Sequence, residues 1–190
     1  MASEVEICNA ALQKLGAQRI TALTDNSVNA RACNAAYARL RVAELRKHSW
    51  NFAIARDALA VDATAPAFGR ANSFTLPSAF LRLLPPYPED NLSDRDWIIE
   101  GRAILTDESA PLYVRYIADV TDPNTMDPLF RDALAARMAW EMCEEITQSN
   151  TKRQLATADY NEAIAAAKRT NAIEMVPAKS PDDTWITVRN

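Results

Sequence analysis

Apolar residues recur with the period of an α-helix at the start of the chain. Ser3 can accept a hydrogen bond from the first turn, and Glu6 completes a capping box. Because Gly16 readily adopts the left-handed conformation that ends helices, we predict a helix over residues 3–15. Its inward positions, three or four residues apart, are Val5, Cys8, Leu12 and Leu15.

A second helical pattern covers residues 27–47. The rest of its surface is basic and contains a single acidic residue, Glu44. We therefore predict an amphipathic helix with one apolar face and one charged face. Its inward positions are Cys33, Ala36, Tyr37, Leu40 and Ala43. Its basic positions are Arg31, Arg39, Arg41, Arg46 and Lys47.

Two more helices are predicted in the last third of the chain. Pro128 suits a first turn behind Asp127 as the cap. After a short break at residues 149–150, Thr151 and Gln154 predict a capping box for a helix that runs to about residue 170. Breaks this short join antiparallel neighbours. The apolar residues that recur with helical spacing in the first of these helices are Leu129, Ala133, Ala136, Trp140 and Cys143.

Prolines and β-prone residues mark the middle of the chain. None of the 10 prolines precedes Pro66, and none lies between Pro128 and Pro177, so long helices are confined to the two flanks. Gly101 predicts a hairpin turn, and residues 77–84 read as a short helix begun by proline. Runs rich in β-branched and aromatic residues predict strands at residues 73–76, 97–100, 102–105 and 112–117.

These elements predict an α+β chain, mainly α. We expect an antiparallel four-helix bundle with a β-rich insertion between helices two and three and an extended C-terminal arm. The bundle would comprise residues 1–56 and 127–174, the insertion residues 57–126, and the arm residues 175–190.

Composition removes most classes of enzyme. The chain has 190 residues, and its net charge of −4 gives no general attraction to nucleic acid or to anionic membranes. His48 is the only histidine, which excludes multi-histidine metal centres. The 3 glycines are too scattered for a phosphate-binding loop. We therefore expect no enzymatic activity, no catalytic residues, no cofactor and no metal.

The cysteines and the chain start indicate a protein that stays in the cytoplasm while it folds. Cys8, Cys33 and Cys143 form no C-x-x-C pair and fall on apolar helical faces, so we expect reduced thiols in the core. The start of the sequence lacks the basic and apolar regions of a secretory signal. Apolar runs are too short to span a membrane.

Three features of the helices are candidates for function. Glu141, Glu144 and Glu145 could suggest a metal site, but a solvated acidic face is favoured because helices three and four lack histidine. The basic surface of helix two could contact phosphates. Its arginines are spread round the helix, so salt bridges, for instance with the acidic face of helix three, are favoured. Trp50 and Phe52 are expected to fill the joint between subdomains.

The last residues form a pattern of their own. Pro177 and Pro181 predict an extended spacer, and residues 184–189 are β-prone. Because an isolated strand is unstable, this strip either adds to a partner or docks on the chain's own sheet. The candidate partner-binding residues are Trp185, Ile186 and Val188.

Residues 7–16 read Ile-Cys-Asn-Ala-Ala-Leu-x-x-Leu-Gly, and residues 46–53 read Arg-Lys-His-Ser-Trp-x-Phe-Ala. Together with the pattern of the last two helices, these segments resemble the tail tubular protein A family. Its members are the head-to-tail adaptors of short-tailed bacteriophages. The resemblance extends over about residues 5–174.

The resemblance implies a structural protein of the virion tail, assembled in the host bacterial cytoplasm. Members of the family form a twelve-membered ring between the portal protein and a nozzle protein of the tail tubular protein B type. Genomic double-stranded DNA passes through such a ring without specific binding. The alternative function is a DNA-binding or DNA-packaging accessory protein that uses the basic surface of helix two. Acidic residues that would suit a channel wall or a basic nozzle surface are Glu89, Asp90, Asp94, Asp96, Asp107 and Glu108.

Overall fold

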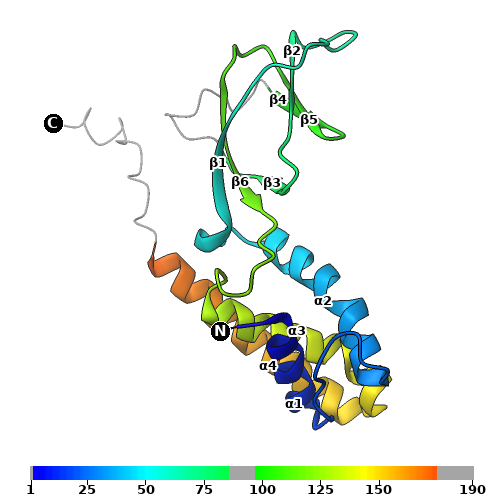
Figure 1. Cartoon of the computed structure of the whole chain (residues 1–190). Helices are drawn as coiled ribbons and strands as arrows, with labels where there is room; N and C mark the ends of the chain where they lie inside the picture. Colours follow the sequence, from blue (N-terminus) through cyan, green and yellow to red (C-terminus); the bar gives the residue numbers. More distant parts are fainter. Residues whose placement is uncertain (1, 86–96, 175–190) are drawn as a thin grey trace, which may run out of the picture.

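The computed structural model describes residues 2–85 and 97–174 (Figure 1). Two helices, α1 (Glu4–Leu15) and α2 (Val28–Lys47), come first, and α3 (Pro128–Thr147) and α4 (Asn150–Ile173) come last. Between them lies the short 3-10 turn η1 (Asn51–Ala53), followed by the strands. These are β1 (Ile54–Leu59), β2 (Asn72–Thr75), β3 (Phe80–Leu83), β4 (Trp97–Glu100), β5 (Ala103–Thr106) and β6 (Leu112–Ala118).

Local capping signals fix the starts of the helices. The capping box of Ser3 and Glu6 is present, and the Ser27 hydroxyl accepts from the first turn of α2. The Asp127 carboxylate caps α3, so the predicted capping box at Ser3 and the predicted cap at Asp127 are confirmed. The predicted start of α4 is wrong, because the Ser149 hydroxyl accepts from the backbone of Lys152 and the helix begins at Asn150.

Gly16 ends α1 with a φ of 68°, in the left-handed region. A β-carbon there would lie 3.6 Å from Lys152 Nζ, an ordinary contact, so any cost of substitution comes from the backbone. We expect Gly16→Ala to lower the free energy of unfolding by about 1–2 kcal/mol. Gly16→Asn should cost less, because asparagine tolerates this conformation. Urea denaturation measures both, and equal losses would contradict the backbone explanation.

The predicted antiparallel four-helix bundle with a β-rich insertion is wrong. Helix α3 is central: α1, α2 and α4 all pack against it, while in the described residues the backbones of α2 and α4 hardly approach each other. The cause is the composition of α3, whose buried positions surround the helix instead of forming one stripe. The strands form two three-stranded antiparallel sheets, and the described residues are 49% helical and 18% strand.

The two sheets pack against each other around a second apolar core. Their strand orders are β1-β6-β3 and β2-β5-β4. The hairpin predicted at Gly101 is confirmed, since β4 and β5 pair with Glu100 opposite Ala103. The residues buried between the sheets are Leu59, Phe74, Leu76, Ile104, Leu112, Val114 and Tyr116.

The short helix predicted over residues 77–84 is wrong. This segment contains β3, which pairs with β6 so that Leu83 lies opposite Tyr116. The strand conformation divides its apolar side chains between the two cores. Leu81 and Leu84 pack into the helical core, and Phe80 and Leu83 pack into the core between the sheets. A helix could not serve both cores in this way, so long-range pairing overrides the local signal.

Candidate functional site

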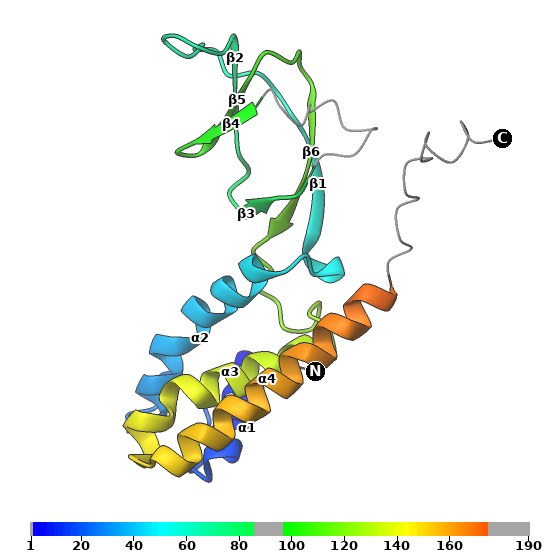
Figure 2. The same ribbon diagram turned by 180° about the vertical axis from the view of Figure 1, so that it is seen from behind.

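The chain turns sharply where α2 leads into β1 (Figure 2). Trp50 is only 1% exposed at this corner, and its indole donates to the Glu44 carbonyl at 3.0 Å. The ring of Phe130, on α3, lies 5.0 Å from that of Trp50 and 5.0 Å from that of Phe52. The prediction that Trp50 and Phe52 fill the joint is confirmed.

The end of α4 is fastened to the same corner by two asparagines. The Asn51 backbone donates to Asn171 Oδ1 at 2.8 Å, and the Asn51 side chain donates to the Asn171 carbonyl at 2.9 Å. In return, Asn171 Nδ2 donates to the Ser49 carbonyl at 3.0 Å. Because Asn171 is buried, these bonds hold the end of α4 firmly at the corner.

Three arginines join the strands to α2 and to the turn that follows it. The buried Arg41 guanidinium contacts the carboxylate of Asp119, directly after β6, at 2.9 Å. Arg82, on β3, donates to the Ser49 hydroxyl at 3.0 Å. Arg46 donates to the Leu81 carbonyl. The helices and the strands are therefore held together by charged hydrogen bonds as well as by apolar packing.

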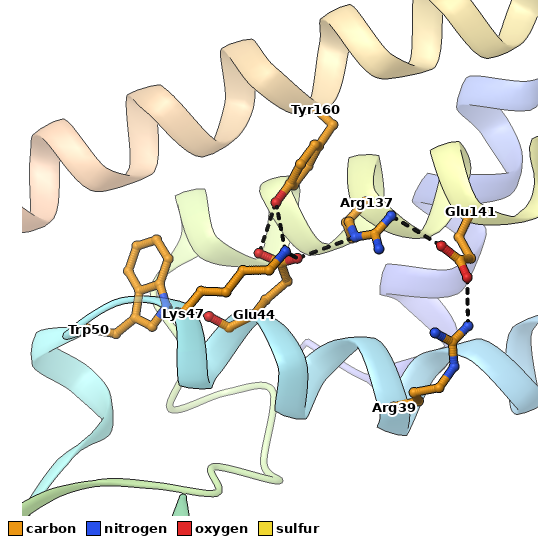
Figure 3. Close-up of polar contacts among 7 residues, drawn as sticks. All are labelled: Arg39, Glu44, Lys47, Trp50, Arg137, Glu141 and Tyr160. Carbon is orange, nitrogen blue, oxygen red and sulfur yellow. Dashed lines mark hydrogen bonds and ion pairs between the residues drawn. The ribbon is translucent and has the colours of Figure 1, made fainter. Parts of the chain in front are cut away.

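A network of charged residues links α2, α3 and α4 (Figure 3). Its centre is Glu44, whose side chain is 1% exposed. The Glu44 carboxylate contacts Lys47 Nζ at 2.6 Å and Arg137 Nε at 3.3 Å, and it accepts from the Tyr160 hydroxyl at 3.0 Å. Burial, and then the Glu44 carboxylate, raise the pKa of Tyr160, which stays a neutral donor.

The network continues along α3 to the surface. Arg137 lies over the ring of Trp140 at 4.1 Å and contacts Glu141 at 3.2 Å. Arg39, on α2, contacts the other oxygen of Glu141 at 2.9 Å. The predicted salt bridge between helix two and the acidic face of helix three is therefore present.

The hydrogen bond from Arg39, and then the nearby Arg137, hold the pKa of Glu141 below its usual range. A carboxylate with a depressed pKa stabilises the fold above its unfolded-state pKa and loses this effect as the pH falls through its folded-state pKa. We expect Glu141→Gln to lower the free energy of unfolding at pH 7 by about 0.5–1 kcal/mol. The difference from the wild type should shrink as the pH falls below 4.5, the ordinary pKa of glutamate, and should vanish below the folded-state pKa. Urea titrations at several pH values measure it, with Glu145→Gln as control.

The structure corrects the predicted charge pattern of helix two. Arg41 and Glu44 were placed on its surface, but both are buried. Their partners lie far away in sequence, so a helical wheel could not reveal them. Of the remaining basic residues, Arg39, Arg46 and Lys47 also contact groups within the chain. Arg31 is exposed and donates to the Asn26 side chain.

Some predicted site residues lie outside the described residues. They include Trp185, Ile186 and Val188, and four of the six acidic residues assigned to a channel wall or nozzle contact. Of the other two, Asp107 is engaged within the chain: it contacts Arg70 at 2.7 Å and accepts from the Ala71 backbone.

Sequence reasoning missed an apolar surface on the second sheet. Phe68, in the loop before β2, is 89% exposed, and Ile98 on β4 is 48% exposed. A groove of about 610 Å³ lies between this loop and the outer face of the sheet. The loop lies at the end of the strands farthest from the helices (Figure 2). The only signal in the sequence is an aromatic residue next to Gly69 in a segment with turn composition.

Within residues 2–85 and 97–174, no group of histidine, cysteine, aspartate or glutamate side chains is placed to hold a metal ion. Among the same residues, the helices are too short or too polar to cross a membrane. Cys8, Cys33 and Cys143 are buried free thiols. Comparison with known proteins finds no family model that matches the chain and no matching curated protein.

Proposed function

We propose that this chain is a structural protein of a bacteriophage virion, a ring-forming head-to-tail adaptor between the portal and the tail nozzle. In this role it forms part of the channel through which DNA leaves the capsid. One observation carries the proposal: the two segments that resemble the tail tubular protein A family are those that fix the shape of the subunit.

The first segment, residues 7–16, fixes the connection between α1 and α2. The Asn9 side chain donates to the Ile20 carbonyl at 2.9 Å and accepts from the Ile20 backbone at 2.8 Å. This pair of bonds pins the loop after α1 to the helix itself. Gly16 turns the chain into that loop. The motif therefore fixes the path of the chain as it leaves α1 toward α2.

The second segment, residues 46–53, forms the corner between the helices and the strands. Trp50 and Phe52 fill it, and Asn51 binds the end of α4. A ring subunit that bridges two neighbours must keep its two parts at a constant angle, because every copy has to present the same surfaces. The corner supplies that rigidity.

The alternative, a DNA-packaging accessory protein, rests on the basic surface of α2. Phosphate binding needs arginine and lysine side chains directed at the nucleic acid. Here Arg41 is buried against Asp119, Arg39 contacts Glu141, and Lys47 contacts Glu44. These contacts favour a structural use of the basic residues over DNA binding.

The experiment that tests the proposal mixes the purified chain with the portal protein encoded by the same genome. Light scattering after size exclusion should show a complex with one copy of this chain per portal subunit. A different ratio, or no complex when portal and nozzle are both present, would refute the proposal. Tight, salt-sensitive binding to duplex DNA would favour the accessory protein instead.

A further inference from the structure

His48 lies at the corner, directly after α2, and its imidazole faces the end of α4. The Asn171 Nδ2 atom lies 3.3 Å from His48 Nε2, and it also donates to the Ser49 carbonyl at 3.0 Å. The rings of His48 and Trp50 meet edge to face, with 4.7 Å between their centres. His48 therefore adds a titratable group to the hydrogen bonds that fasten Asn171 to Asn51.

The neighbouring bonds determine which group of the Asn171 side chain faces the imidazole. The Ser49 carbonyl can only accept a hydrogen bond, and the Asn51 backbone N–H can only donate one. Turning the Asn171 amide over would set two acceptors against each other at Ser49 and two donors against each other at Asn51. Asn171 therefore presents its NH2 group to His48, so Nε2 must accept and the single ring proton lies on Nδ1.

A second proton on the imidazole is incompatible with this arrangement. An imidazolium has a donor at both ring nitrogens, so its Nε2–H would point at the NH2 group of Asn171. Burial of the imidazole, and then the nearby charges of Lys168 and Arg82, lower the pKa of His48. The charged residues of the surrounding elements are Glu44 and Lys47 on α2, which pair with each other, Arg82 on β3, Lys168 on α4, and Glu174, which contacts the Asn51 side chain.

We propose that His48 is a pH-sensitive latch for the end of α4: the neutral imidazole holds Asn171 at the corner, and a proton taken up from water at Nε2 releases it. The imidazole is half-buried, so it can turn toward water once it is charged. Because the folded-state pKa lies below 6.5, the bond contributes in full above pH 6.5, and its contribution is lost as the pH falls from 6.5 to below the folded-state pKa. All these groups belong to one chain, so the latch does not depend on the proposed ring.

Nuclear magnetic resonance of the nitrogen-labelled full-length chain tests the arrangement of protons. His48 is the only histidine, so its ring signals need no assignment. At about pH 7.5 we expect a proton on Nδ1 and none on Nε2. On acidification the ring should titrate with a midpoint below 6.5, and Lys168→Gln should raise that midpoint because it removes a like charge. A proton on Nε2 at about pH 7.5, or a midpoint at or above 6.5, would overturn the proposal.

Hydrogen exchange of the Asn51 backbone amide measures whether the latch opens, because this N–H donates to Asn171. Its protection, relative to an unstructured peptide at the same pH, should fall about three- to ten-fold between about pH 7.5 and about pH 5, the effect of losing one hydrogen bond. The fall should have the midpoint of the ring titration. In His48→Gln, whose side-chain oxygen can accept but does not titrate, the protection should not fall. The Ile20 amide is the matched control, since it also donates to an asparagine oxygen, on Asn9, at 2.8 Å. An equal fall at Ile20, a fall in His48→Gln, or no fall at Asn51 would overturn the proposal.

Discussion

Replacing Glu44 by glutamine is expected to lower the free energy of unfolding by about 3–5 kcal/mol. The substitution keeps the size of the side chain but removes the charge that faces Arg137, whose side chain is only 14% exposed. Arg137 then keeps only the more exposed Glu141 as a carboxylate partner, which does not fully offset the desolvation cost of its buried guanidinium. Lys47 is half exposed, so water can solvate its ammonium group when the carboxylate is removed. Most of the lost stability therefore comes from Arg137. Urea denaturation followed by circular dichroism measures the change.

A double-mutant cycle separates this charge effect from a loss of packing. Arg137→Met alone should also destabilise the chain, because it leaves Glu44 buried with fewer partners. The double variant Glu44→Gln, Arg137→Met should be more stable than the sum of the two losses predicts. Glu145→Gln, at an exposed position of α3, should change the unfolding free energy by less than about 0.5 kcal/mol. Additive losses would show that Glu44 and Arg137 do not act as a pair.

The second large effect is expected at the corner. Trp50→Ala should lower the free energy of unfolding by about 3–5 kcal/mol, because it leaves a cavity against Phe130. It also removes the indole N–H that donates a hydrogen bond to the Glu44 carbonyl. Since the corner sets the angle between helices and strands, the variant should assemble poorly with the portal even under conditions where it is folded.

Trp50→Phe is the matched control. It keeps much of the aromatic packing but loses the indole N–H and the volume of the second ring, so a smaller loss of about 1–2 kcal/mol is expected. This variant should still assemble with the portal. If the alanine and phenylalanine variants lost equal stability, packing against Phe130 would not be what holds the corner.

The helices could be predicted from the sequence because their capping signals depend only on neighbouring residues. The Ser3 capping box, the Asp127 cap and the turn at Gly16 all act within one helical turn, so the sequence displays them directly. At the start of α4 two local signals competed. The Ser149 hydroxyl caps the helix, and Thr151, where the capping box was predicted to begin, lies inside the helix.

Long-range contacts explain the wrong predictions. The bundle was inferred from one apolar stripe per helix, whereas alanines on several sides of α3 allow three helices to approach it. The strand β3 forms because it pairs with β6, about 35 positions further along. Burial of Glu44 depends on Arg137 and Tyr160, which follow it by more than 90 residues. From the sequence alone, charged residues on a predicted helix are assigned to its solvent-exposed face, because their distant partners are not known.

The exposed groove had almost no signature in the sequence. Phe68 and Ile98 lie 30 positions apart and come together only when the loop before β2 folds over the sheet. The β-branched and aromatic residues of β4 indicate a strand, but they do not reveal which face a second sheet will cover. The pairing places Ser73, Leu105 and Ile98 in one row, and the burial of Phe74 and Ile104 on the opposite face shows that this row faces outward.

Electron microscopy of the chain mixed with its portal tests directly whether the chain is a head-to-tail adaptor. We expect a closed ring on the portal, with the rotational symmetry of the portal and an open axial channel wide enough for duplex DNA. Every subunit in that ring should show the same angle between helices and strands. Portal particles without added density, or density bound away from the channel axis, would show that the chain is not such an adaptor.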